Sequence, residues 1–299
     1  MMIFKFTNGT NFQDEGFSPI QRARWVDIIR LIISLMTFTL STFVLFSIIM
    51  SKKSRVKGFN LYLLLHLLSE ICLGALVIFI TASSLKSGFF PPSRPVCIFS
   101  SVVIHSYIFY NMWINVLISG EVFQMLRISS QRQRYDPTCS KKILIRALIT
   151  FTASVVVGMY QSVNLSFSNV YIEWNKCVGT RGYDITVMNK IILSIVTVFI
   201  PIAILLYTSF TVYKDQLLPA KGKCRFITTF FLRIVIFTTT SSVLSAVAAI
   251  VKNENLFLIG SFLFLIQGFV VSTLSLQKYD LRKAALDIIC NWSRNNEPC

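Results

Sequence analysis

Glu70 is an acidic residue inside an otherwise apolar stretch of the chain, and it follows Asn60 by ten residues. On a helix that rises about 1.5 Å per residue, this spacing sets Glu70 about 15 Å deeper than Asn60. An ionisable side chain at such a depth in a membrane must face the protein interior or water. Asn111 and Asn115, one turn apart on another apolar stretch, are its expected neighbours. The three residues predict a polar core that binds a cation or proton or switches between two helix packings; the alternative is a neutral, structurally satisfied glutamate.

A second candidate set lies near the start of the third apolar stretch. His105 follows Cys97 by two helical turns. We predict that it lines an outer cavity where a ligand contacts His105 together with Ile104, Ile108 and Phe109. A histidine that only packs between helices is the alternative.

Glu121 and Arg233 form a third candidate pair. Glu121 lies near the end of the third apolar stretch and Arg233 near the start of the sixth, so both are expected far from the outer cavity. A contact between them would act as an inner latch between two helices. A plain interfacial charge at Glu121 is equally compatible with the sequence.

Several kinds of chemistry are excluded by missing residues. The only histidines are His66 and His105, and neither a CxxC nor a Gly-x-Ser-x-Gly motif occurs. A zinc hydrolase needs more ligands of this kind, and a retinal protein needs a lysine within 257–276, where there is none. We therefore predict no enzyme activity, no catalytic residues, no metal site and no cofactor.

Seven long apolar stretches must position these residues. They cover 28–50, 61–85, 98–126, 143–163, 191–213, 227–251 and 257–276. Each is long enough to cross about 30 Å of hydrocarbon as a helix, and lipid offers the backbone no other hydrogen-bond partner. The predicted fold is an all-α membrane protein, a seven-transmembrane helix bundle with a short amphipathic eighth helix. It divides into a short extracellular N-terminal segment (1–27), the bundle (28–276) and a cytoplasmic helix and tail (277–299).

The net charge of +16 is distributed unevenly over the loops. Basic residues gather between spans one and two, three and four, and five and six, and after span seven, which by the positive-inside rule places these segments in the cytoplasm. Fewer basic residues fall on the other side, where Arg22, Arg24 and Arg30 at the outer end of span one are a local feature that runs against this orientation. The charges thus indicate a lipid bilayer rather than nucleic acid as the partner. We expect a multi-pass protein of the plasma membrane with its N-terminus outside. Glycosylation sequons at Asn8 and Asn164 both fall on the predicted outer side, where we expect them to be modified.

Of the seven cysteines, only Cys97 and Cys177 fall on the predicted outer, oxidising side. We predict a disulfide between them, with two unpaired thiols as the alternative. After span seven, a helical repeat of apolar residues with Lys278, Arg282 and Lys283 on the polar side predicts an amphipathic helix on the inner membrane surface.

Taken together, these residues resemble a divergent G-protein-coupled receptor over roughly residues 25–293. Asn60 with Glu70 resembles the second-helix pattern of that family, and Cys97 with Cys177 its disulfide to the second outer loop. Glu121 stands where the rhodopsin-like branch has the acid of its Asp/Glu-Arg-Tyr motif, and Pro201 where that branch has its helix-five proline. The resemblance implies an extracellular ligand and a heterotrimeric G protein as partners.

The departures from the rhodopsin-like pattern are specific. Glu121 is followed by Val122 and Phe123, so the arginine used in G-protein activation is missing. Span seven lacks Asn-Pro-x-x-Tyr, and its Gln267-Gly268-Phe269 is similar to the cyclic-AMP-receptor-like and secretin-like branches. The expected function is transduction of an unknown extracellular ligand by helix rearrangement to a G protein. The alternative is a non-signalling seven-helix transporter or lipid-handling membrane protein.

Overall fold

The computed structural model describes residues 24–50, 58–87, 94–131, 138–166, 170–173, 176–179, 192, 194–217, 223–251, 254–279 and 281–287. Its long helices are α1 (Arg24–Met50), α3 (Gly58–Ser87), α4 (Arg94–Ser130), α5 (Ser140–Ser166), α7 (Ile200–Lys214), α8 (Lys223–Val251) and α9 (Glu254–Leu276). A π-helical turn, η1 (Ile195–Phe199), precedes α7. Two short strands, β1 (Val170–Glu173) and β2 (Lys176–Gly179), pair in antiparallel register with Val170 opposite Gly179.

Six helical segments are long and apolar enough to cross a membrane: Trp25–Met50, Asn60–Lys86, Ile98–Ser130, Ser140–Tyr160, Ile195–Lys214 and Ile259–Leu276. The chain is therefore a multi-pass, helical membrane protein. The remaining predicted span, 227–251, is helical as part of α8, but several of its side chains fall outside the described residues. A seventh crossing by α8 stays a prediction.

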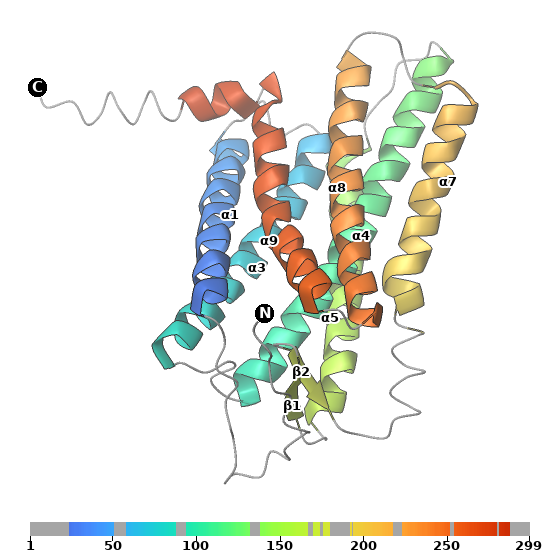
Figure 1. Ribbon diagram of the computed structural model, residues 1–299. Coiled ribbons are helices and arrows are strands. Elements are labelled where there is room, and N and C mark those ends of the chain that lie inside the picture. The colour runs from blue at the N-terminus through green and yellow to red at the C-terminus, as the bar shows by residue number, and fades with distance from the viewer. Residues whose placement is uncertain are drawn as a thin grey trace, which may run out of the picture.

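Consecutive long helices run in opposite directions, so the bundle has two distinct ends (Figure 1). We call them the hairpin end, where β1 and β2 lie, and the terminal-helix end, where residues 281–287 lie. α1 begins at the hairpin end and α3 begins at the terminal-helix end. Under the predicted orientation, the hairpin end is the extracellular one.

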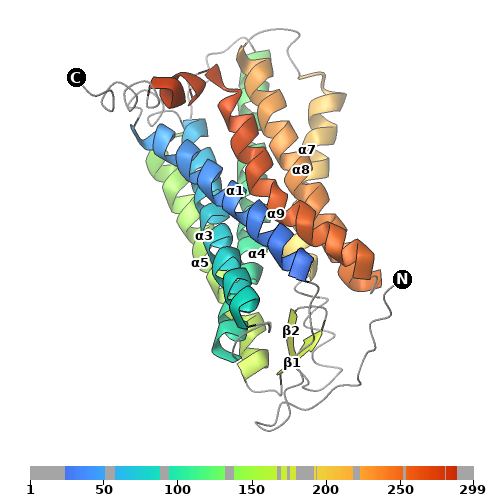
Figure 2. The same ribbon diagram turned by 60° about the vertical axis from the view of Figure 1, so that its left-hand side comes forward.

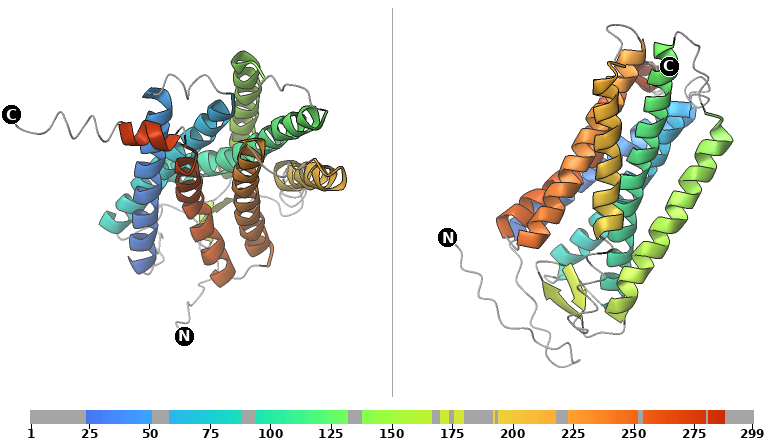
Figure 3. Two further views of the ribbon diagram at one scale, coloured as in Figure 1. Left: turned by 90° about the horizontal axis from the view of Figure 1, so that it is seen from above. Right: turned by 90° about the vertical axis from the view of Figure 1, so that its right-hand side faces the viewer.

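α4 lies at the centre of the bundle and contacts α3, α5, α7, α8 and η1. α1 packs on α3 and α9, and α8 packs along α9. In the most apolar part of the α4 span, 50% of the residues are buried inside the protein. The corresponding share for the span formed by η1 and α7 is 11%, so α7 is peripheral. Figure 3 shows the same arrangement from above, with α7 at the edge of the bundle.

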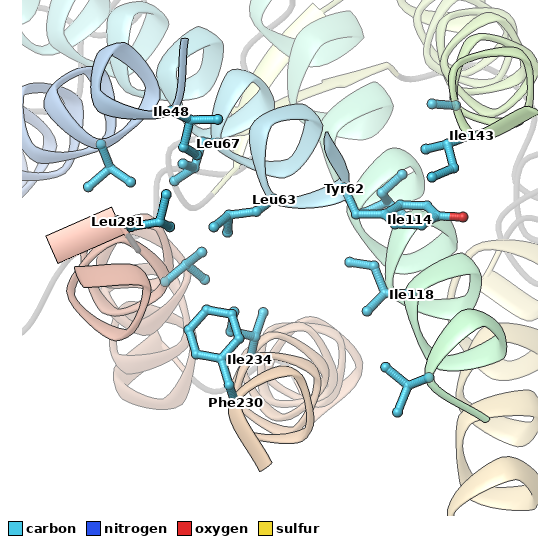
Figure 4. Packing of buried hydrophobic residues seen from close by; sticks show 14 of the residues in the cluster. Ile48, Tyr62, Leu63, Leu67, Ile114, Ile118, Ile143, Phe230, Ile234 and Leu281 are labelled. Atoms are coloured by element: carbon cyan, nitrogen blue, oxygen red, sulfur yellow. The ribbon is translucent and has the colours of Figure 1, made fainter. Parts of the chain in front are cut away.

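The largest cluster of buried apolar side chains lies toward the terminal-helix end. It joins residues of six long helices with one from the segment after α9, and includes Ile48, Leu63, Ile114, Ile143, Ile234 and Leu281 (Figure 4). Lipid tails are as apolar as these side chains, so the hydrophobic effect does not drive helices together within the membrane. Shape and polar contacts therefore decide how the helices pack.

Gly158 shows how close such packing becomes. A Cβ atom at this position would lie 2.2 Å from Oγ of Ser106 and 2.6 Å from the carbonyl oxygen of Val102. Only glycine allows α5 to approach α4 to this distance.

Pro201, expected to interrupt span five, lies in the first turn of α7. Proline has no backbone N–H to donate to the preceding turn. The turn directly before it is π-helical, and such turns occur mostly as single-turn bulges within α-helices.

The segment after α9 is helical over residues 281–287, as the amphipathic pattern predicts. Leu281 and Ala285 are buried, whereas Arg282 and Lys283 are exposed. The prediction that Lys278 lies on the polar side with them is wrong. Lys278 is 8% exposed, and its Nζ donates a hydrogen bond to Oδ1 of Asn60. The apolar positions of the pattern beyond 287 lie outside the described residues.

Candidate functional site

Glu70 is the centre of a buried hydrogen-bond network. Its side chain is 1% exposed. Three donors reach its Oε1: the hydroxyl of Tyr107 at 2.6 Å, Nε2 of Gln267 at 3.2 Å and Nδ2 of Asn111 at 3.3 Å. These donors come from α4 and α9, so one carboxyl oxygen joins three helices.

The network extends to a fourth helix through Gln267. Its Oε1 accepts a hydrogen bond from Oγ of Ser241 on α8 at 3.0 Å, and its Nε2 lies 3.3 Å from the Tyr107 hydroxyl. On the other side, Oδ1 of Asn111 accepts a hydrogen bond from Oγ of Ser69 at 2.8 Å. We call the set Glu70, Tyr107, Asn111, Gln267 and Ser241 the polar centre.

His66 lies one turn before Glu70 on α3 and is fully buried. Its Nε2 is 3.9 Å from Oε1 of Glu70, which is too long for a direct hydrogen bond. Among the described residues, neither ring nitrogen of His66 has a hydrogen-bond partner.

Gly268 allows Glu70 to lie against α9. A Cβ atom on Gly268 would lie 2.6 Å from Oε2 of Glu70 and 2.5 Å from Cγ2 of Thr37 on α1. The hydroxyl of Thr37 in turn donates to the carbonyl oxygen of Leu265 at 3.0 Å. The Gln267-Gly268 pair therefore supplies both a donor for Glu70 and the space for its side chain.

Asn115 forms a second link between α4 and α8. Its Nδ2 donates to Oγ1 of Thr238 at 2.5 Å, and Thr238 Oγ1 donates to the carbonyl oxygen of Val235 at 3.1 Å. Asn115 is fully buried, and its Oδ1 has no partner among the described residues. Thr238 and Ser241 are three residues apart, so both links hold the same face of α8.

The predicted polar core is thus reproduced only in part. Glu70 and Asn111 are in contact, whereas Asn115 bonds to α8 instead. The sequence analysis did not identify Tyr107 and Gln267 as members of this network. Their positions could have indicated it, because Tyr107 lies one turn before Asn111 and Gln267 is the only amide or charged residue within 257–276.

The residues predicted at an outer cavity all lie on α4: Ile104, His105, Ile108 and Phe109. Nδ1 of His105 lies 2.7 Å from the carbonyl oxygen of Ser101, so this ring is satisfied within its own helix. Phe109 is buried and its ring centroid lies 6.0 Å from that of Trp113. Ligand binding by these four residues stays a prediction.

Glu121 and Arg233 are not paired in this conformation. Glu121 is 4% exposed, and its Oε1 accepts a hydrogen bond from the backbone N–H of Thr138 at 3.1 Å. Arg233 is exposed on α8 and forms no ion pair within the described part of the chain. The latch stays a prediction that would require another packing.

The remaining predicted sites concern glycosylation and the disulfide. Asn8 and the side chains of Cys97, Cys177 and Asn164 lie outside the described residues. The predicted disulfide is therefore untested, although β2, which carries Cys177, contacts α4. Cys72 and Cys139 are free thiols. Among the residues that the structure describes, no group of three or more His, Cys, Asp or Glu side chains could hold a metal ion.

No family model matches the chain, and no curated protein is significantly similar to it.

Proposed function

We propose that this protein is a G-protein-coupled receptor that responds to an extracellular ligand at the hairpin end and engages a heterotrimeric G protein at the terminal-helix end. Three features support the proposal. First, α4 is central and contacts α3, α5, α7 and α8. Second, α9 packs against α1 and so closes the bundle. Third, a short helix with exposed basic residues follows α9.

The observation that carries the proposal is the way α8 is held. Thr238 is bonded to Asn115 and Ser241 to Gln267, so two hydrogen bonds fasten one face of α8 to α4 and α9. Hydrogen bonds between transmembrane helices contribute about 0.6 kcal/mol on average and up to about 1.7 kcal/mol. Releasing both therefore costs about 1–3 kcal/mol, which is the range in which a ligand can shift a two-state equilibrium.

In this mechanism a ligand acts by binding more tightly to the conformation in which α8 has moved away from the polar centre. Movement of α8 then opens the terminal-helix end to a G protein. Gln267 couples the two parts, because the same side chain donates to Glu70 and accepts from Ser241.

The arginine that usually follows the acid at the position of Glu121 is absent, and Val122 stands in its place. A receptor of this kind would therefore reach its active packing without that arginine.

The test is nucleotide exchange by purified heterotrimeric G proteins. The full chain would be reconstituted in lipid nanodiscs, and exchange on each G-protein class would be measured with and without a ligand library. We expect exchange above the level of empty nanodiscs for at least one class. Background exchange throughout, in a preparation that remains folded by circular dichroism, would refute coupling.

The transporter alternative has one observation in its favour, namely the buried polar atoms of His66 and Asn115 that have no hydrogen-bond partner in the described part of the chain. A solute path needs such groups. Uptake of a labelled solute into proteoliposomes, lost on Glu70→Gln, would favour this alternative over the receptor.

A further inference from the structure

α1 begins at the hairpin end of the bundle and packs on α3 and α9 (Figure 2). A second polar cluster joins these three helices near the start of α1. Asp27 is 3% exposed, and its Oδ2 accepts a hydrogen bond from Oγ of Ser84 on α3 at 3.1 Å. Nη2 of Arg30 donates to Oγ of Ser261 on α9 at 3.3 Å. The polar centre and its links involve none of these residues.

Arg30 is the cation of this cluster, and no acid among the described residues forms an ion pair with it. It is partly buried within the membrane span Trp25–Met50, and in the described part of the chain it forms no ion pair. Its Nε is buried and lacks a hydrogen-bond partner among the described residues. A charged side chain inside a membrane bundle is costly unless it is paired, and such residues mark functional sites.

Ser34 supplies an independent observation one turn deeper on α1. Its side chain is 1% exposed, and its Oγ has no partner among the described residues. Thr39 and Ser47 on the same helix each bond to the carbonyl oxygen four residues back, at 2.8 Å. Ser34 does not, so a buried hydroxyl group is left available beside Arg30.

Helical geometry puts these groups on one face. Positions 27, 30 and 34 are three and four residues apart and therefore lie on the same side of α1. Asp27 bonds to α3 and Arg30 bonds to α9, so this face points between those two helices. The available donors, Arg30 Nε and Ser34 Oγ, both lie on it.

We propose that this cluster binds the carboxylate group of a small extracellular ligand, with α-amino acids as the favoured class. Arg30 supplies the charge and the paired N–H donors that match a carboxylate, and the hydroxyl group of Ser34 supplies a neutral donor. Asp27 on the same face disfavours ligands with several negative charges and favours one that also carries an ammonium group. The site is separate from the predicted cavity around His105, and binding there does not depend on G-protein coupling.

Three compounds with a common phenylethyl body test the recognition. 3-Phenylpropionate carries only the carboxylate, phenethylamine carries only the ammonium group, and L-phenylalanine carries both. Each would be titrated against the full chain in phosphatidylcholine nanodiscs, with the thermal unfolding midpoint as the readout. We expect both carboxylates to raise the midpoint, L-phenylalanine most, and phenethylamine to leave it unchanged.

Two substitutions assign the effect to the cluster. Arg30→Gln is expected to weaken carboxylate binding at least about tenfold, because it removes a charge-assisted hydrogen bond. Ser34→Ala is expected to weaken it several-fold. Arg233→Gln removes another unpaired arginine, on α8, and Thr39→Val removes a hydroxyl group already satisfied on α1; both are expected to leave binding unchanged.

The proposal is overturned if neither carboxylate raises the midpoint at concentrations up to about 10 mM, well above the millimolar affinity of a weak ligand. It is also overturned if Arg30→Gln, still folded by circular dichroism, binds as the parent does. A midpoint that instead follows the content of anionic phospholipid in the nanodisc would show that Arg30 binds lipid phosphate. Because the readout is binding, these outcomes are distinguishable from a failure of G-protein coupling.

Discussion

Tyr107 on α4 donates a hydrogen bond of 2.6 Å to Oε1 of Glu70 on α3, the shortest of the three that this oxygen accepts. The ring of Tyr107 also packs edge-on against Phe264 of α9, with centroids 5.0 Å apart. One side chain therefore ties together the three helices that surround the buried carboxyl group.

Tyr107→Phe removes this hydrogen bond and keeps the ring contact. We expect a loss of about 1–3 kcal/mol in the free energy of unfolding, since a buried polar group loses its best partner. Tyr110→Phe is the matched control, because Tyr110 is also buried on α4 but its hydroxyl makes no hydrogen bond to the described residues. Chemical denaturation in detergent micelles would measure both. Equal stability of the two variants would contradict the role given to Tyr107.

Gly268→Ala places a methyl group 2.6 Å from Oε2 of Glu70 and 2.5 Å from Cγ2 of Thr37. Both contacts are too close for real atoms, so α1, α3 and α9 must separate, and we expect a destabilisation of about 1–3 kcal/mol. At Gly120 on α4 an added Cβ would meet nothing within 4 Å. Gly120→Ala should therefore be neutral or stabilise by up to about 1 kcal/mol, because alanine favours the helix. Thermal unfolding followed by circular dichroism distinguishes the two outcomes.

Thr238→Val breaks the link from Asn115 to α8 while preserving the shape of the side chain. If release of α8 accompanies activation, removal of a bond worth about 0.6–1.7 kcal/mol raises ligand-independent nucleotide exchange by about threefold to twentyfold. The control is Thr239→Val, since the neighbouring hydroxyl of Thr239 has no partner among the described residues. Exchange that rises equally in both variants, or in neither, would argue against this link as a restraint.

Lys278→Met tests the contact between the end of α9 and the start of α3. The substitution keeps an unbranched side chain but removes the hydrogen bond to Asn60, which is fully buried. We expect a loss of about 1–3 kcal/mol, as for other buried polar groups that lose a partner. Lys283→Met changes an exposed lysine of the same segment and should stay within about 0.5 kcal/mol of the parent. A reversed order of the two stabilities would show that Lys278 is not structural.

Several features of this protein follow from local sequence alone. The apolar stretches are long enough to cross a bilayer, and lipid leaves their backbones no partner outside a helix, so helical spans follow from length and composition. The depth of Glu70 follows from the helical rise, and a buried acid requires donors. Asn111 was identifiable as one of them because it is a polar residue within another apolar stretch.

The partners of the other polar residues depend on how each helix is rotated and tilted, which no single stretch of sequence determines. Between helices in lipid there is little hydrophobic driving force, so rotation is set by side-chain shape and by a few polar contacts acting together. Asn115 turns to Thr238 rather than to Glu70, Gln267 reaches both Glu70 and Ser241, and Lys278 turns inward to Asn60. Each of these pairings joins residues far apart in the chain, and only the packed bundle decides which of them meet.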